Sequence, residues 1–439
     1  GIFKCSFLGN PIVCVSGLPN MKNVLDREFK SPENGGISTG TISNNSDVAT
    51  EIIGSESLLR ATDKTEHSWL RKLVGKSMSP GSVSKSLPQL VLGANSAVEE
   101  ILEKGGSDGN GVKMEDICTK YTLDVAWRQI LGLNLSDEEV PTFHQAVQTW
   151  IFGVINPILF VLPNFLARRL KSFRARKYLD DLIIAKIDDL KRNGPDGSTL
   201  SAMVFATDDD DDSVASGSQK LTQMQIIDNA LLLILAGSET SASTLTTAML
   251  FLGMYPDIYK KIQEEQEQIQ SKYGRGCELT REMLDDEMPL LEAFIRETMR
   301  IKPLNSGAPR VTKEAIVVDG KQIPKDWTVF CNVLLTHALD PKTIETDGGS
   351  NMDIYKGFKP ERWLSEETKP SEWMAFGYGA RYCLGANLAM AEMKIFLSIV
   401  ARKMEFSLVN GTDNIKWQKL SIIPKPKDGT LIYATKNLE

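Results

Sequence analysis

The chain has 439 residues, of which 42% are hydrophobic and 24% charged. This globular balance excludes wholesale disorder and collagen-like repeats. The net charge is −7, so the chain lacks the basic surplus that nucleic-acid-binding proteins usually carry. Six cysteines without a CxxC motif or regular spacing argue against a disulfide scaffold and a structural zinc site. A reducing compartment is the simpler interpretation.

Hydrophobic periodicity and turn residues predict a mostly helical chain with a smaller β part. In chain order, we expect a hairpin and loops over residues 1–60, helices over 66–77 and on to about 133, and a long amphipathic helix over 166–191. A break over 193–219 precedes a long apolar helix over about 222–252, which ends before Pro256. A helix over 289–301, strands near 315–318 and 327–330, a glycine-rich loop over 376–385 and a last long helix from 384 to about 404 complete the chain.

We expect one compact domain over residues 1–439, mostly α with a minor β part. Because the sequence opens directly into a strand-like segment at Gly1, we also expect an N-terminal anchor region to be missing. The most apolar internal segment, residues 151–167, contains Pro157 and Pro163 and is too short for a membrane-spanning helix. It is either an apolar loop over a cavity or a buried core segment.

The sharpest motif is a glycine-rich segment that leads into the last predicted helix, Phe376-Gly377-Tyr378-Gly379-Ala380-Arg381-Tyr382-Cys383-Leu384-Gly385. A helix N-terminus favours a thiolate at Cys383, because it offers positive potential and free N–H groups. Gly379 and Gly385 permit positive φ or close approach of a flat ligand. Arg381 can pair with an anionic group on that ligand. The alternative is a buried cysteine in an ordinary glycine turn.

The ten residues match the Phe-x-x-Gly-x-Arg-x-Cys-x-Gly haem loop of the cytochrome P450 family at every defined position. The chain resembles this family over essentially its whole length, which implies an N-terminally truncated, single-domain P450 fold. The resemblance implies that Cys383 is the thiolate ligand of a haem iron and that Phe376, Gly377 and Arg381 bind the haem. Thiolate ligation pushes electron density onto the iron and favours O–O cleavage. The motifs look nearest to sterol-, brassinosteroid- and retinoid-hydroxylating members.

A second motif is Glu297-Thr298-Met299-Arg300, whose acid and base share one helix face at i and i+3. Such pairs occur on most surface helices. In the family, a Glu-x-x-Arg pair is joined by an arginine from a later segment, which corresponds here to Arg362. The resemblance therefore implies an ion network of Glu297, Arg300 and Arg362 under the haem loop, with a positioning role.

A third motif, Ala236-Gly237-Ser238-Glu239-Thr240, lies in the middle of the long apolar helix. A threonine there often bonds only its own i−4 carbonyl, whereas an acid in an apolar helix is costly. The segment resembles the family's Ala-Gly-x-Asp/Glu-Thr oxygen-binding motif. This implies that Glu239 and Thr240 support proton delivery to dioxygen and that Ala236 lies at the haem.

A fourth set of residues matches positions that contact the haem propionates in the family. His67 and Arg71 share one helix face at i and i+4, and Arg310 and Arg381 complete a cationic set for two carboxylates. The alternative for each is a solvated or core charge. With only three histidines, a His-rich metal centre is excluded, and His144 and His337 receive no functional role.

The resemblance also implies an apolar substrate pocket above the haem. A pocket lined in this way favours a rigid apolar substrate with few polar groups. Its expected lining residues are Leu232, Leu235, Ala236, Leu304, Ala308 and Ile422, with residues 152–165 as a lid.

These implications together predict a haem-thiolate monooxygenase that inserts one atom of O₂ into a sterol, isoprenoid, retinoid or fatty acid. No flavin, NADPH or iron–sulfur segment is present, so electrons must come from an external donor, either NADPH-cytochrome P450 reductase or a ferredoxin. The alternatives are a hydroperoxide-rearranging enzyme that needs no reductase and a non-catalytic haem-binding protein; Glu239 and Thr240 favour the oxygenase. We expect membrane association, at the cytosolic face of the endoplasmic reticulum or in a plastid, with residues 151–166 dipping into the surface.

Overall fold

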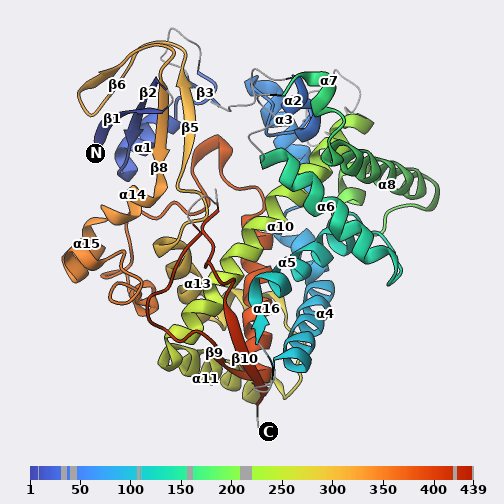
Figure 1. Cartoon of the computed structure of the whole chain (residues 1–439), viewed down its shortest axis with the longest axis vertical. Helices are drawn as coiled ribbons and strands as arrows, with labels where there is room; N and C mark the ends of the chain where they lie inside the picture. Colours follow the sequence, from blue (N-terminus) through green and yellow to red (C-terminus); the bar gives the residue numbers. More distant parts are fainter. Residues whose placement is uncertain are drawn as a thin grey trace. The chain divides into compact units, whose positions relative to one another are not determined.

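The computed structural model describes residues 1–7, 9–30, 37–39, 47–105, 109, 111–155, 162–207, 220–418 and 423–437 (Figure 1). The chain forms two compact units. The first contains residues 1–40, 90–121 and 240–439, and the second contains residues 41–89 and 122–239. The mostly helical architecture with a smaller β part confirms the predicted fold class. That residues 1–439 act as one haem domain stays a prediction.

Both units contain more helix than strand. Those of the first unit are α1 (Leu18–Leu25), α11 (Pro256–Tyr273), α12 (Arg281–Asp286), α13 (Pro289–Ile301), α14 (Val333–Ala338), α15 (Pro341–Asp347) and α16 (Ala386–Lys403). Those of the second unit are α2 (Asp47–Ile53), α3 (Lys64–Lys76), α6 (Glu139–Ile155), α7 (Asn164–Ala167), α8 (Lys171–Asn193) and α9 (Thr199–Val204). The helices that continue from one unit into the other are α4 (Pro80–Lys104), α5 (Met114–Val125) and α10 (Gln223–Met254).

The strands belong to the first unit and form three sheets within the described residues. The largest has the order β1-β2-β8-β5-β3, with strands β1 (Ile2–Phe7), β2 (Asn10–Val15), β3 (Ile37–Thr39), β5 (Gly307–Thr312) and β8 (Thr328–Asn332). Its neighbours are antiparallel except β2 and β8. The other sheets pair β4 (Val112–Lys113) and β9 (Met404–Leu408) with β10 (Leu431–Lys436), and β6 (Ile316–Val318) with β7 (Lys321–Ile323).

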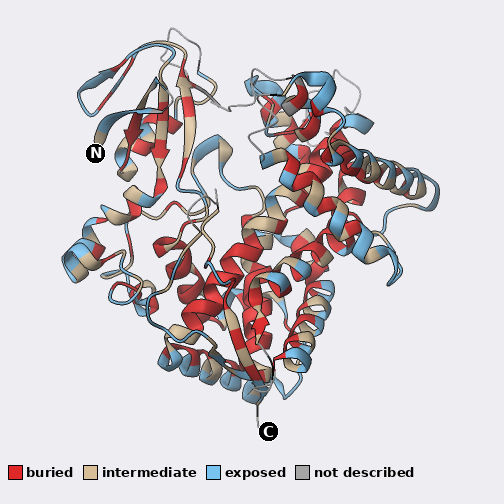
Figure 2. Ribbon diagram, in the orientation of Figure 1, coloured by how far each residue is buried: buried red, intermediate tan, exposed pale blue. Residues whose placement is uncertain are grey.

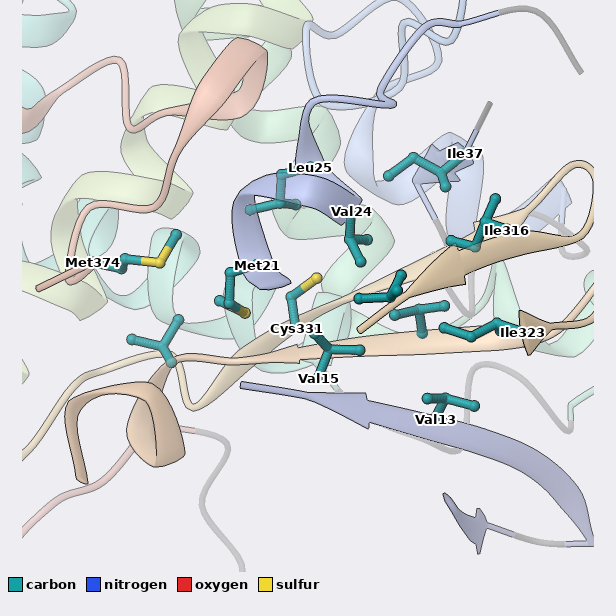
Figure 3. Packing of buried hydrophobic residues seen from close by; sticks show 13 residues of the cluster. Val13, Val15, Met21, Val24, Leu25, Ile37, Ile316, Ile323, Cys331 and Met374 are labelled. Atoms are coloured by element: carbon teal, nitrogen blue, oxygen red, sulfur yellow. The ribbon is translucent and has the colours of Figure 1, made fainter. Parts of the chain in front are cut away.

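The core of the largest sheet also anchors the cysteine loop. Val13 and Val15 alternate along β2 with residues that point to the other face, and their side chains belong to the same buried cluster as Val24 of α1 (Figure 3). Met374, which precedes the glycine-rich loop, is a member of the same cluster and is only 3% exposed. The start of the loop is therefore held by the packing of the N-terminal sheet.

Most predicted elements are confirmed, including the N-terminal hairpin, α3, α10, α13 and α16. Two predictions were wrong in detail. The helix expected over 166–191 is two helices, because Leu170 is extended (ψ 151°) between α7 and α8. The expected break over 193–219 contains α9, whose first turn is capped by the Ser198 hydroxyl. The long helix ends before Pro256 as predicted, and Pro256 begins a further helix, α11, that the sequence analysis did not predict; proline is tolerated at the first helical position.

Candidate functional site

The cysteine loop runs from Met374 to the start of α16 and is closed by its own backbone. The amide of Cys383 donates to the carbonyl of Phe376 at 2.9 Å, and the amide of Gly377 donates to that of Met374 at 2.9 Å. The aromatic ring of Phe376 packs edge-on against Trp373, with 5.8 Å between ring centroids. These bonds bring Phe376, Gly377 and Cys383 together in one turn, as the motif predicts.

The glycines of the loop differ in what they contribute. Gly377 and Gly379 have φ of +79° and +70°, which side chains with a Cβ rarely adopt. Gly385 does not need positive φ; its φ is −89°, and it forms the N-cap of α16. A Cβ built on Gly385 would meet no atom within 4 Å, and one built on Gly377 only an atom at 3.9 Å. The backbone beside the cysteine can thus be approached closely by a flat ligand.

Cys383 lies two residues before the N-cap of α16 and is exposed. The first-turn amides of a helix point outward along its axis and give that end a partial positive charge. A thiolate is therefore favoured at this position, and the thiol is accessible to a ligand on the face of the loop.

Two of the predicted propionate-binding arginines come together in the first unit. Glu28, in the segment after α1, accepts from Arg310 Nε at 2.7 Å and from Arg381 Nε at 3.3 Å. The side chains of Glu28 and Arg310 are 4% and 8% exposed, and that of Arg381 is 13% exposed. The two guanidiniums therefore share this carboxylate.

Sequence reasoning missed Glu28. It lies about 280 residues before Arg310, and no local motif marks it. The sequence offered only an indirect sign of such an acid: two largely buried arginines need a negative charge near them. The strand pairing explains the contact: β5, which carries Arg310, pairs with β3, and Glu28 bridges to Ile37 at the start of β3.

The predicted ion network of Glu297, Arg300 and Arg362 is confirmed, and the three side chains are at most 3% exposed. Helix α13, which carries Glu297 and Arg300, is buried over most of its second half (Figure 2). Arg300 donates two bonds to the Glu297 carboxylate, both at 2.8 Å, and Arg362 Nε donates to it at 3.1 Å. Trp363 Nε1 adds a fourth bond at 2.9 Å, and Arg362 also pairs with Asp347. The segment after α15 is thus bound to the end of α13.

His337, which received no functional role from the sequence, connects this network to the cysteine loop. Its Nδ1 lies 3.0 Å from the carbonyl of Arg300, and its Nε2 accepts from the amide of Met374 at 2.9 Å. Burial is the main reason that the pKa of His337 falls to about 4. The ring is therefore neutral at physiological pH, with the proton on Nδ1 and the lone pair of Nε2 available to Met374.

The motif on α10 lies on a less buried stripe of an otherwise buried helix. Leu232, Leu235, Ala236, Glu239 and Thr240 are intermediate or exposed, at spacings of three and four residues that define one face. Their neighbours Ile234 and Ser238 are buried, and Ser238 bonds the carbonyl of Ile234 at 2.7 Å. Leu232, Leu235 and Ala236, which the sequence analysis expected to line a pocket, all lie on this stripe; the pocket itself stays a prediction.

The remaining predicted residues stay predictions. His67 and Arg71 lie on one face of α3 in the second unit, with His67 2% exposed. In the first unit, Leu304 and Ala308 are half-buried. Ile422 and residues 156–161 of the expected lid lie outside the described residues. Within the described residues, no helix is long and apolar enough to cross a bilayer.

The residues of the first unit fit a haem. The loop offers an accessible thiol at a helix N-terminus and glycine backbone open to a flat ring. Arg310 and Arg381 are two largely buried arginines, and arginine is the residue type that pairs best with carboxylates. Each of these features is local to the first unit.

Comparisons with known proteins agree with this chemistry. A family model described as Cytochrome P450 matches residues 1–432. Cytochrome P450 26A1 of Danio rerio is 27% identical, with 100% of this chain and 82% of the relative covered. Abscisic acid 8'-hydroxylase 1 of Arabidopsis thaliana is 27% identical, with 85% and 73% covered. The solved structure "Retinoic acid bound cyanobacterial CYP120A1" has a TM-score of 0.79 and 25% identity, with 99% of this chain and 92% of that chain covered.

Proposed function

We propose that this chain, which belongs to the cytochrome P450 family, is a monooxygenase that hydroxylates an isoprenoid acid with electrons from an external reductase. The observation that carries this proposal is the cysteine loop: an accessible Cys383 before α16, beside glycine backbone that leaves room for a flat ring. The alternatives are a hydroperoxide-rearranging enzyme and a non-catalytic haem-binding protein.

In this proposal, Cys383 ligates the iron, and Arg310 and Arg381 hold the haem carboxylates. His67 and Arg71 would add contacts from α3, and Ala236 from α10. When bound, the haem supplies the activation of dioxygen that inserts one oxygen atom into the substrate. The fixed loop backbone around Phe376 and Gly377 orients the thiol and keeps it at the helix N-terminus.

We assign proton handling to Glu239 and Thr240 of α10. Both side chains are intermediate in burial, so they are partly accessible, whereas Ser238 beside them is buried and bonded to its own helix. A carboxyl and a hydroxyl at adjacent helix positions can hold a proton and pass it toward the reacting oxygen.

An isoprenoid acid is supported by the names of two relatives. One is an abscisic acid hydroxylase and the other is a P450 with bound retinoic acid, and both compounds are isoprenoid carboxylic acids. Half-buried leucines at positions 232, 235 and 304 supply apolar surface that suits such a skeleton. Titration of the purified haem protein with retinoids, sterols and fatty acids, followed by the Soret shift, tests this class. A response confined to sterols or fatty acids would reject it.

The enzyme assignment is tested by spectroscopy and turnover together. The reduced carbon monoxide complex should show the band of thiolate ligation, Cys383→Ala should abolish it, and Cys277→Ala should keep it. With NADPH and a P450 reductase, Thr240→Ala should bind substrate and take electrons but release peroxide in place of product, with product formation roughly 10²–10⁴-fold lower.

Each other outcome has a distinct meaning. A thiolate band that survives in Cys383→Ala would reject the ligand assignment, and unchanged coupling in Thr240→Ala would reject the proton role. Conversion of a hydroperoxide without reductase would favour the rearranging enzyme. Haem binding with no turnover of any substrate would favour the non-catalytic protein.

Contact with a membrane surface is also part of the proposal. Large apolar side chains flank residues 156–161 and are exposed: Phe152 by 65%, Ile155 by 49% and Phe165 by 64%. Burying a few such side chains gives only weak, reversible attachment, at about 25 cal/mol per Å². Neutral liposomes should therefore carry the chain in flotation, and the double variant Phe152→Ser/Phe165→Ser should not float. Leu92→Ser, at another exposed apolar position, should behave like the parent; equal flotation of all three would exclude this contact.

A further inference from the structure

Two cysteines lie next to each other on the N-terminal hairpin, away from the cysteine loop. Cys5 of β1 and Cys14 of β2 have their Sγ atoms 3.6 Å apart. The register pairs Cys5 with Ile12 and Cys14 with Phe3, so the two cysteines are diagonal neighbours on one face of the hairpin. The backbone pairing of the strands therefore holds the two thiols in contact.

The two thiols differ in their surroundings. Val13 and Val15, on either side of Cys14, point into the core, so the cysteines lie on the opposite face of the sheet (Figure 3). Cys14 is 8% exposed, whereas Cys5 is exposed. Burial, and then the neighbouring Cys5 thiol, raises the pKa of Cys14 to about 11. Cys14 thus stays a protonated thiol at neutral pH, and a reagent from solvent meets Cys5 first.

We propose that Cys5 and Cys14 form a reversible oxidation site, in which a hydroperoxide converts the pair to an intramolecular disulfide. This inference does not rest on the proposed substrate or on haem. Because the hairpin already holds the two sulfurs in contact, little conformational change is needed before a disulfide can form.

The reaction balances in two steps. The Cys5 sulfur attacks hydrogen peroxide, an S–O bond forms while the O–O bond breaks, and one water leaves, which gives a sulfenic acid. The Cys14 sulfur then attacks the Cys5 sulfur, an S–S bond forms while the S–O bond breaks, and a second water leaves. The two sulfurs lose two electrons and the peroxide gains them. A dithiol reductant reverses the change through thiol–disulfide exchange.

The consequence for the fold follows from the position of the hairpin. β1 is the edge strand of its sheet and pairs only with β2, which in turn pairs with β8. A cross-link between β1 and β2 fixes this edge and prevents the strand from separating locally. Oxidation should therefore slow amide hydrogen exchange in β1 and leave the exchange of α16 unchanged.

The test uses the purified full chain treated with hydrogen peroxide, then denatured, alkylated and digested with trypsin. The peptide of residues 5–22 contains both cysteines. It should lose two alkylation sites and the mass of two hydrogens, and dithiothreitol should restore both sites. The variant Cys277→Ser should show the same disulfide, because its change lies in a different segment.

The variant Cys14→Ser separates this proposal from simple surface oxidation. Without a resolving thiol, Cys5 should remain as a sulfenic acid that dimedone traps, and no internal disulfide should form. Full alkylation of both cysteines after peroxide treatment of the parent chain would overturn the proposal. So would a Cys5 disulfide that joins only separate chains, seen as a dimer on a non-reducing gel.

Discussion

Two arginine clusters in the first unit differ in the carboxylates that they contact. In the structural cluster, Arg300 and Arg362 meet the carboxylates of Glu297 and Asp347, and the four side chains are at most 3% exposed. Arg300 also donates to two backbone carbonyls, those of Asn351 and Gly357. Each guanidinium has a carboxylate partner inside the protein.

In the binding cluster, Arg310 and Arg381 share the Glu28 carboxylate, and the arginine side chains are 8% and 13% exposed. Burial of unbalanced charge is costly, and both clusters hold at least one acid among their arginines. In our proposal, the arginines of the binding cluster also pair with the carboxylates of a haem, whereas those of the structural cluster fix the segments around the loop.

The largest effect is expected in the structural cluster. Glu297→Gln removes the carboxylate that both Arg300 and Arg362 contact, and the free energy of unfolding should fall by about 3–5 kcal/mol. Glu361→Gln is the matched control. Glu361 is next to Arg362 in the sequence, but its side chain is 46% exposed and pairs with Lys261. That change should cost at most about 1 kcal/mol. Urea unfolding measures both, and equal losses would show that burial of the network contributes little.

The sequence predicted the structural cluster because its parts carry local signals. Glu297 and Arg300 share a helix face, and the family resemblance supplied Arg362. The binding cluster was predicted only in part. Arg310 and Arg381 came from family positions, but Glu28 is brought to them by strand pairing between β3 and β5, which depends on the tertiary fold.

The position of the long helix was predicted well: α10 was placed almost to the residue. Its less buried stripe consists of residues that the family resemblance supplied as site or pocket residues, since periodicity alone does not tell which face of such an apolar helix meets the core. The role of His337 was not predicted: its two partners are backbone groups of Arg300 and Met374, and backbone partners leave no mark in the sequence.

The next effect concerns the His337 link between the structural cluster and the loop. Its pKa is lowered to about 4 in the folded chain, against about 6.5 when unfolded, so the unfolded state binds more protons between these values. The stabilisation is complete above pH 6.5 and is lost as the pH falls toward 4. Between pH 7 and pH 5 the loss should be about 2 kcal/mol.

Other groups titrate in the same range, so a variant is needed to isolate His337. Glu392, whose pKa burial raises to about 8, changes stability in the opposite direction as the pH falls. The difference in unfolding free energy between the parent and His337→Gln should shrink as the pH falls from 7 to 5, because glutamine cannot take up the proton. If the difference in unfolding free energy between parent and variant stays constant with pH, protonation of His337 does not break the hydrogen bond that its Nε2 accepts from the Met374 amide.

The smallest effect is expected in the binding cluster, where the two members should act in opposite directions on haem affinity. In our proposal Arg310 is a charge-assisted partner of a haem carboxylate, so Arg310→Gln should weaken haem binding by about tenfold. Glu28→Gln removes the carboxylate that competes for the same arginines, so haem binding should be kept or strengthened, while the haem-free chain becomes less stable because two cations lose their partner. Haem transfer to apomyoglobin measures the first quantity and urea unfolding the second. If Glu28→Gln loses haem as fast as Arg310→Gln, Glu28 aligns the arginines and does not compete with the haem, and its role would then resemble that of Glu297 in the structural cluster.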